Sequence, residues 1–364
     1  MQVRPRLLQV ERHPEQVRTP GHRWNDVRRL AVVRDDRMGD LVLTLPAVHA
    51  LRTTYPAARL VLMVAPAQLP LARMIEGVDE VLEAERRTEG LRRQFERIGS
   101  DLVVCVSRRA GPAWAAFRAG VPHRVGSGRR LYSPLYERRV MESRRGGARH
   151  EAEYALSFAH RAGATGGVAR FPLAIPDEAM AGIDAWLASR RVPDRFVVLH
   201  PGSGGSCPVW PATHYGQLAA RLHAEGVPVV LSIGPLDGTV RQELEQTTPA
   251  ARVLPCFDAG FPLLPGLLRR ATLLIGNSTG PLHLAAALGT PTLALHAPWP
   301  TCGVRRWGPY AGNGWGLVAE HPQADRWSQR ERRRHARALM ATISPRTTAG
   351  CALDLLEGRT PRLP

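Results

Sequence analysis

Short apolar runs alternate with amphipathic stretches along most of the chain, and the alternation predicts strands and helices in turn. In the first half, the apolar runs predict strands at 30–33, 60–64, 101–106 and 125–126. Helical spacing predicts helices at 41–52, 74–81, 91–98 and 114–118. A regular strand–helix alternation is typical of a doubly wound parallel sheet with helices on both faces.

The second half repeats this pattern after an interruption. Residues 131–149 form a predicted basic loop, followed by an amphipathic helix at 150–162, an extended stretch at 172–176 and a helix at 178–190. Strands are then predicted at 196–199, 227–233, 252–254, 271–275 and 292–296, with helices between them at 213–225, from 238 to about 247, at 262–270 and at 281–289. At 364 residues the chain is long for one core, so two domains are expected.

The break in the pattern at 191–195 places the domain boundary. We therefore predict a loose N-terminal extension at 1–27, a first domain at 28–190, a second domain at 196–330 and a helical tail at 331–364. Each domain has a polar turn after its first strand, and this repetition predicts a ligand cleft between the two.

The turn at 276–280 is the most informative stretch of the second domain. Ser278 and Thr279 are candidate N-caps, and Pro281 suits the first turn of the helix that follows. A strand, a tight turn and a helix start gather free backbone N–H groups, which favours binding of a phosphate or diphosphate. Two alternatives stay open: an ordinary connection whose Gly and Pro serve geometry alone, and a His283 that is a packed core residue rather than a ligand contact.

The composition gives the chain a strong positive charge, which favours an anionic binding partner. The formal net charge is +17, and all 49 cationic residues are arginine. Arginine binds phosphate bidentately, so the excess favours an anionic partner, although a coding bias toward arginine would give the same composition. Nucleic acid is the less favoured partner, because arginine clusters are not interleaved with aromatic residues.

Cysteine spacing and the lengths of the apolar runs indicate the cellular compartment of the protein. The five cysteines are scattered without a Cys-x-x-Cys pair, which predicts reduced thiols and neither a disulfide framework nor a zinc site. No apolar run approaches the ~20 residues of a membrane-spanning helix, and residues 1–25 do not resemble a secretory signal. We therefore expect a cytoplasmic protein.

Four motifs in order carry a resemblance to a known family. They are the segment 32–52 containing Arg34-Asp-Asp-Arg-Met-Gly-Asp40, the segment His200-Pro-Gly-Ser203 with Trp210-Pro211, the segment 277–289 containing Ser278-Thr-Gly-Pro-Leu-His283, and Arg305-Arg-Trp-Gly-Pro-Tyr310. Together they resemble glycosyltransferase family 9, the bacterial heptosyltransferases, over about residues 30–310. The resemblance implies an α/β fold of the GT-B type, in which two Rossmann-like doubly wound domains face each other across a cleft.

The resemblance also implies an activity and a set of site residues. It implies inverting transfer of heptose from ADP-heptose to an anionic lipopolysaccharide core acceptor, with no metal and no cofactor. The arginine excess separately predicts peripheral contact with the anionic inner face of the membrane. Asp40 would be the general base, with Arg37, Met38 and Gly39 on the acceptor side. The implied donor contacts are Ser203, Ser206, Asp237, Ser278, Thr279, Gly280, His283 and Arg306.

The residues themselves agree with this role for Asp40 but do not decide it. An ionised carboxylate after the first strand can accept the proton of an attacking sugar hydroxyl. The same residue could instead cap the following helix. Asp35 and Asp36 are better explained as partners of Arg34 and Arg37, and Trp210 is left unassigned between core and base stacking.

Two departures from the family pattern keep other functions open. The segment before Trp210 is Cys207-Pro208-Val209 where family members often carry a lysine, and Ser278 stands where they often carry an aspartate. The alternatives are a GT-B transferase that uses another nucleotide sugar and a nucleotide-sugar-binding protein without turnover. A retained Asp40 favours the catalyst over the binding protein.

Overall fold

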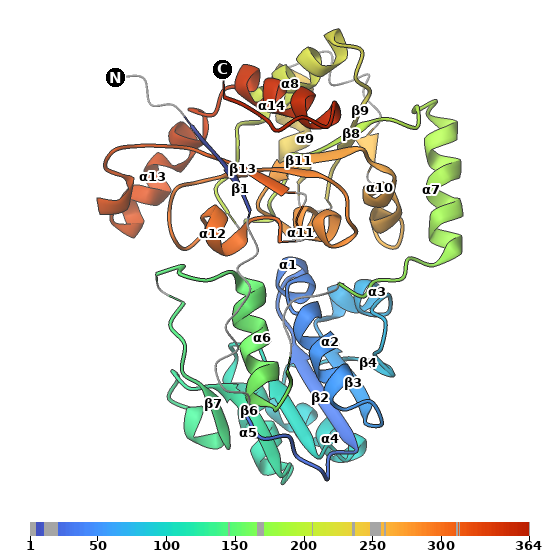
Figure 1. Ribbon diagram of the computed structural model, residues 1–364, viewed down its shortest axis with the longest axis vertical. Coiled ribbons are helices and arrows are strands. Elements are labelled where there is room, and N and C mark those ends of the chain that lie inside the picture. Colours follow the sequence, from blue (N-terminus) through green and yellow to red (C-terminus); the bar gives the residue numbers. More distant parts are fainter. Residues whose placement is uncertain are drawn as a thin grey trace. The chain divides into compact units, whose positions relative to one another are not determined.

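The computed structural model describes the chain in two units, each built around its own sheet. The described residues are 5–10, 21–144, 146–165, 171–205, 207–234, 237–247, 256–257, 260–310, 312 and 314–363. The N-terminal unit comprises His13–Arg144 and Arg149–Ala174, and the C-terminal unit comprises Met1–Arg12, Arg145–Ala148 and Ile175–Pro364. Figure 1 shows the elements of both units.

The N-terminal unit contains a parallel sheet in the order β4-β3-β2-β5-β6-β7. Its strands are β2 (Arg29–Arg34), β3 (Arg59–Val64), β4 (Glu80–Glu83), β5 (Leu102–Cys105), β6 (His123–Ser127) and β7 (Arg138–Val140). The central strands β2, β3 and β5 are apolar on both faces because helices cover both sides of the sheet, as the alternation predicted.

Two strands and one connector of this sheet differ from the sequence prediction. The helix expected at 74–81 is wrong: the chain forms the short helix α3 (Leu69–Ala72) and then β4. The loop expected at 131–149 contains a 3₁₀ turn, η2 (Ser133–Leu135), and β7. Both missed strands lie at sheet edges, where partial exposure permits polar sequences that lack a continuous apolar run.

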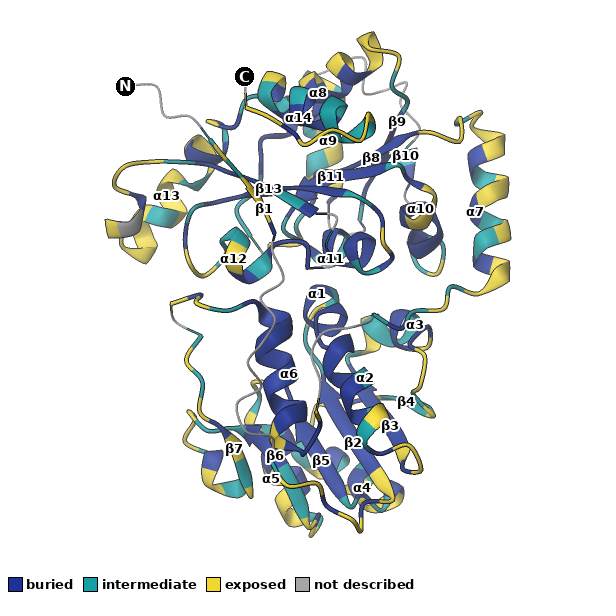
Figure 2. Ribbon diagram, in the orientation of Figure 1, coloured by how far each residue is buried: buried dark blue, intermediate teal, exposed yellow. Residues whose placement is uncertain are grey.

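Four helices of this unit pack together in two pairs. The helices of the unit are α1 (Met38–Val42), α2 (Leu45–Thr54), α4 (Thr88–Ile98), α5 (Ala110–Arg118) and α6 (Glu151–Arg161), beside α3. Helix α4 packs with α5, and α2 packs with α6. The prediction of an amphipathic helix at 150–162 is wrong in one respect, because α6 is buried around its whole circumference from Glu151 to His160 (Figure 2).

The C-terminal unit contains a sheet in the order β1-β13-β12-β11-β8-β9-β10. Its strands are β1 (Arg6–Gln9), β8 (Val197–His200), β9 (Val229–Ser232), β10 (Cys256–Phe257), β11 (Leu273–Asn277), β12 (Thr292–His296) and β13 (Gly314–Val318). All neighbours are parallel except β1, which pairs antiparallel with β13. The predicted loose extension at 1–27 is therefore wrong at 6–9, which form β1, and at Trp24 and Val27, which are buried in the N-terminal unit. The predicted strand at 252–254 lies outside the described residues.

Helices of the C-terminal unit extend its core beyond the predicted boundaries. They are α7 (Asp177–Ser189), α8 (Ala212–Ala224), α9 (Gly238–Thr247), α10 (Leu264–Arg270), α11 (Gly280–Ala287), α12 (Val304–Trp307), α13 (Gln329–Met340) and α14 (Pro345–Leu356). Helix α7 belongs to this unit because it packs on α10, where Arg270 pairs with Asp184 at 2.6 Å. The chain thus divides at 174/175, earlier than the expected 190–196.

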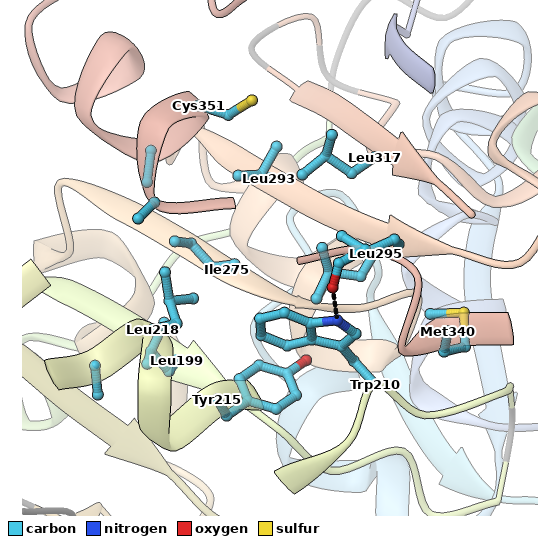
Figure 3. Close-up of a cluster of buried hydrophobic side chains, with 14 of the residues drawn as sticks. Leu199, Trp210, Tyr215, Leu218, Ile275, Leu293, Leu295, Leu317, Met340 and Cys351 are labelled. Carbon is cyan, nitrogen blue, oxygen red and sulfur yellow. Dashed lines mark hydrogen bonds between the residues drawn. The ribbon is translucent and has the colours of Figure 1, made fainter. Parts of the chain in front are cut away.

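Trp210 lies in the core of the C-terminal unit. Its ring is fully buried against Tyr215 and among side chains of the central strands, and its indole N–H donates to the carbonyl of Ile343 at 2.9 Å (Figure 3). The same core includes Met340 and Cys351 of the predicted helical tail. Trp210 is therefore a core residue rather than a platform for base stacking.

Candidate functional site

Each sheet has one position where the strand order reverses direction, and the chemistry-bearing turns gather there. In the N-terminal unit, β3 lies on one side of β2 and β5 on the other, so the turns after β2 and β5 adjoin. In the C-terminal unit, β9 and β11 flank β8 in the same way. In doubly wound folds ligands bind at the carboxyl ends of the strands at such points.

Arg34 and Asp40 are the centre of the N-terminal site. The Arg34 side chain is 1% exposed; its Nη2 lies 2.5 Å from Asp40 Oδ1, and its Nη1 donates to the carbonyl of Val106 at 3.0 Å. The Asp40 side chain keeps 12% of its surface exposed. The alternative of a helix N-cap is wrong, since α1 begins after Arg37 and the carboxylate of Asp40 binds a guanidinium instead.

Further carboxylates surround the same arginine. Asp36 lies 3.4 Å from Arg34, and Glu151 lies 4.0 Å from it while pairing with Arg144 at 3.0 Å. Burial raises the pKa of Asp36, and the nearby charge of Arg34 opposes this shift. Several acidic groups thus share one buried cation, which orients Asp40.

The other predicted residues of this turn have separate positions. Asp35 pairs with Arg109, not with Arg34 or Arg37, whereas Asp36 does adjoin Arg34 as expected. Arg37 is exposed at the start of α1, Met38 is half-buried and Gly39 is buried. Their predicted acceptor contacts stay predictions.

Asn277 joins the two turns of the C-terminal site. Its side-chain amide donates to the carbonyl of Pro201 at 2.9 Å, and its Oδ1 accepts the backbone N–H of Trp210 at 3.0 Å. Asn277 is fully buried at the end of β11, so these bonds hold the loop after β8 against the start of α11. The sequence motif contained this residue, but no role was assigned to it.

The start of α11 has the features of an anion site. Thr279 is the N-cap, yet its side chain makes no capping hydrogen bond; among the described residues its buried Oγ1 has no hydrogen-bond partner. Gly280 begins the helix, and the first helical bond runs from the N–H of His283 to the Thr279 carbonyl. A hydroxyl and N–H groups not engaged by a capping side chain therefore lie together where a phosphate would bind.

Ser278 and His283 both face the short helix α12. The Ser278 hydroxyl donates to the carbonyl of Trp307 at 2.9 Å. The ring of His283 is buried, and its centroid lies 6.1 Å from the centroid of the Trp307 ring. Arg306 is also buried, and its guanidinium lies 5.1 Å from the centroid of the Trp307 ring. These contacts place the predicted donor residues of the third and fourth motifs in one cluster, while Arg305 is exposed.

Asp237 lies against the loop that follows β8. A Cβ added to Gly202 would meet its carboxylate, so only glycine fits there. Burial lowers the pKa of His200 at the end of β8, and the charge of Asp237 opposes that shift. Ser203 Oγ accepts the N–H of Gly205 at 3.1 Å, and Ser206 lies outside the described residues.

Two features bear on cofactors and membranes. Within the described ranges, no group of three or more His, Cys, Asp or Glu side chains is arranged to hold a metal ion. Nor does any helix in that part of the chain combine the length and apolarity needed to cross a bilayer.

Two doubly wound units, each with a polar site at its switch point, define the class of two-domain α/β proteins with the GT-B fold. Residues 92–336 match the model of Glycosyltransferase family 9 (heptosyltransferase), so the chain belongs to this family and is a glycosyltransferase. The resemblance carried by the four sequence motifs is confirmed.

Relatives and a solved structure agree with this assignment. The chain is 24% identical to a putative glycosyltransferase of Haemophilus influenzae, over 78% of this chain and 86% of that protein. It is 26% identical to lipopolysaccharide heptosyltransferase 2 of Escherichia coli, over 74% and 83%. The structure of E. coli ADP-heptose lipopolysaccharide heptosyltransferase II superposes with a TM-score of 0.73 at 19% identity, covering 91% of this chain and 99% of the other.

Proposed function

We propose that this glycosyltransferase moves heptose from ADP-heptose to a lipopolysaccharide core acceptor, with inversion and without a metal. The observation that carries the proposal is Asp40, a carboxylate anchored by the buried Arg34 and still reachable from solvent at the switch point of its sheet. The names of the relatives support heptose and lipopolysaccharide as the substrates. A protein that only bound the donor would have no need of an anchored base.

The proposed mechanism is a single displacement. Asp40 accepts the proton of an acceptor hydroxyl, whose oxygen attacks the anomeric carbon of the donor. The bond from that carbon to the diphosphate breaks with its electron pair, and ADP leaves. Attack on the face opposite the leaving group inverts the anomeric centre.

Stabilisation of the leaving diphosphate is assigned to the start of α11. Negative charge grows on the leaving oxygen in the transition state, and preformed N–H and hydroxyl donors stabilise it without reorganising. Thr279 and Gly280 supply such donors, and Arg306 supplies a nearby cation. We assign the ribose to Asp237 and the phosphates also to Ser203, as the family pattern implies.

A GT-B transferase that uses another nucleotide sugar is the second candidate. One observation favours it: Ser278 takes the place of a family aspartate, and its hydroxyl is engaged by the Trp307 carbonyl, which reduces its availability to a sugar. Thermal-shift screening against a panel of nucleotide sugars separates the candidates. A larger stabilisation by ADP-heptose than by UDP-, GDP- and other ADP-sugars is expected, and preference for another sugar would overturn the donor assignment.

We place the reaction in the cytoplasm, at the inner face of the membrane. A lipopolysaccharide core acceptor is attached to a lipid, and a protein with a net charge of +17 is attracted to anionic headgroups. Peripheral, salt-sensitive contact is therefore part of the proposal.

A further inference from the structure

Large apolar side chains are exposed in one region of the N-terminal unit. Among the described residues, four of the six exposed large hydrophobic side chains lie in the segment from α5 to the residue that follows β7: Trp114, Phe117, Leu131 and Met141. Leu131 is 103% exposed and thus has no cover at all. Isolated exposed apolar residues are normal, but a group of them marks an interaction site.

The turn that presents Leu131 is held by hydrogen bonds. Ser133 Oγ donates to the carbonyl of Ser127 at 2.6 Å and accepts the N–H of Arg130 at 2.8 Å. The Tyr132 hydroxyl donates to the carbonyl of Arg108 at 2.7 Å, which fixes the turn to the residues before α5. The leucine is therefore displayed by a built turn and is not exposed through fraying.

Contacts connect the elements that carry the four apolar residues. The guanidinium of Arg124 lies 5.6 Å from the ring of Phe117, and its Nε donates to the carbonyl of Leu135 in η2 at 2.8 Å. The thioether of Met141 covers Gly128, just before the arginines that precede Leu131. Helix α5, the turn at 128–136 and the residue after β7 thus adjoin one another.

Arginine dominates this surface. Residues 105–144 contain nine arginines and two acidic residues, both glutamate. Arg118, Arg129, Arg130 and Arg139 are exposed, and the guanidinium of Arg118 lies 5.4 Å from the ring of Trp114. Exposed arginines beside exposed aromatic and aliphatic side chains match a surface with negative phosphates above a hydrocarbon layer.

We propose that these residues form a docking surface for an anionic lipid bilayer, here named the Arg–apolar patch: Trp114, Phe117, Leu131 and Met141 with Arg118, Arg129, Arg130 and Arg139. The patch deepens the proposed function, since it rests on an acceptor that is held in a membrane. Leu131 and Met141 enter the headgroup boundary, Trp114 and Phe117 lie at the interface, and the arginines bind lipid phosphates. A nucleic acid fits less well, because aliphatic side chains at the most exposed points offer no stacking face.

Vesicle sedimentation of the full chain tests the patch. Vesicles of phosphatidylglycerol and phosphatidylcholine are compared with pure phosphatidylcholine at ~0.1 M salt. Arg129→Gln/Arg130→Gln should weaken binding to the anionic vesicles roughly 10- to 30-fold. The matched control, Arg333→Gln/Arg334→Gln on the exposed face of α13, removes the same charge and should weaken binding less than threefold. Equal losses in both variants would mean that net charge alone binds the membrane, and would overturn the patch.

An apolar variant tests the second half of the proposal. Leu131→Ser/Met141→Ser keeps every charge and should still weaken vesicle binding about tenfold, because apolar burial contributes in proportion to area. Unchanged binding would remove the apolar residues from the proposal. Competition by single-stranded RNA that is lost in Arg129→Gln/Arg130→Gln, without a loss of vesicle binding, would assign the patch to nucleic acid instead.

Transfer to a lipid-free core oligosaccharide separates this proposal from the proposed function. On that acceptor, both patch variants should transfer sugar at the same rate as the unmodified protein. Their transfer rate should fall only when the acceptor is embedded in vesicles. If the unmodified protein binds vesicles through the patch but transfers no sugar from any donor, the proposed function is wrong and the proposed docking surface is supported. Loss of rate by both variants on the lipid-free acceptor would instead place the patch at the acceptor site.

Discussion

Nη2 of Arg34 lies 2.5 Å from Oδ1 of Asp40, which joins the end of β2 to the first turn of α1. The guanidinium is buried and also binds the Val106 carbonyl at the end of β5, so it cannot rotate away from the carboxylate. Anchoring one oxygen of Asp40 orients the other. This geometry is the basis of the first two predictions.

Asp40→Asn should abolish most transfer and leave donor binding intact. An amide of the same shape cannot accept the proton of the attacking hydroxyl, and loss of a general base typically costs ~10²–10⁴-fold in rate. Donor binding, measured by calorimetry with ADP, should change less than about twofold, because the proposed donor residues belong to the C-terminal unit. An Asn variant that keeps more than half its rate would remove Asp40 from the mechanism.

Arg34→Met should destabilise the N-terminal unit. The change leaves the carboxylates of Asp36, Asp40 and Glu151 without their shared cation, and removing one partner of a buried ion pair costs about 3–5 kcal/mol. Arg37→Met, at an exposed position three residues later, is the matched control and should stay within about 0.5 kcal/mol. Urea denaturation measures both. Equal stability of the two variants would show that Arg34 is not structurally coupled to these acids.

The sequence predicted the parts of this site that depend on local pattern. Asp40 follows a buried strand and belongs to a family motif, so its position could be inferred. Glu151 lies close to Arg34 because α6, more than a hundred residues later in the chain, packs in the same unit. Local periodicity cannot predict a contact between positions that far apart. The burial of α6 on all sides was missed for the same reason.

The same distinction explains the C-terminal unit. The strand–turn–helix at β11 and α11 was predicted because apolar runs and helix-start residues mark both elements. The side-chain bonds of Asn277 to Pro201 and Trp210 join residues 67 or more positions apart. Such bonds depend on the strand order, which an individual motif does not contain.

Stability should fall as the pH is lowered from about 6.5 to about 4, partly through His296. Burial lowers the pKa of His296 from 6.5 to about 4, with Nδ1 near the Cys302 carbonyl. Over that range the unfolded chain binds a proton that the folded chain does not, so His296 lowers the free energy of unfolding by up to roughly 3 kcal/mol at the acid end.

Denaturation of His296→Asn across this pH range tests the assignment. The variant should lose that part of the pH dependence, since asparagine does not titrate. His223→Asn, at an exposed position on α8, should keep the unmodified slope. A His296→Asn profile parallel to that of the unmodified protein would show that His296 titrates normally.

Transfer should proceed at the full rate in excess EDTA. In the proposed mechanism the N–H groups at the start of α11 and the guanidinium of Arg306 stabilise the leaving diphosphate. EDTA does not remove these groups, because they belong to the protein. Addition of Mg²⁺ or Mn²⁺ should leave the rate unchanged. A rate that EDTA removes and either ion restores would require a metal in the mechanism.

The sugar should contribute little to donor affinity. The Ser278 hydroxyl binds the Trp307 carbonyl, so it offers less to sugar hydroxyls than the family carboxylate would. ADP should therefore bind within about tenfold of ADP-heptose, a gap of ~1.4 kcal/mol. If calorimetry gave a hundredfold preference for ADP-heptose, strong sugar contacts elsewhere would be required. Ser278→Asp should widen the gap only if the new carboxylate turns away from the Trp307 carbonyl.

Thr279→Val tests whether the start of α11 binds the diphosphate. The Thr279 hydroxyl is buried and has no hydrogen-bond partner among the described residues, which costs free energy in the ligand-free protein. Its replacement by a methyl group should therefore leave stability unchanged or slightly raised. The same change should weaken ADP binding about five- to tenfold, because one hydrogen bond to a charged phosphate is lost. Thr290→Val is the matched control: the Thr290 hydroxyl donates to the Leu268 carbonyl at 2.6 Å, so this variant should lose about 1 kcal/mol of stability and keep ADP affinity. The reverse pattern, with Thr279→Val unstable but binding ADP normally, would mean that the Thr279 hydroxyl is structural and that the diphosphate binds elsewhere.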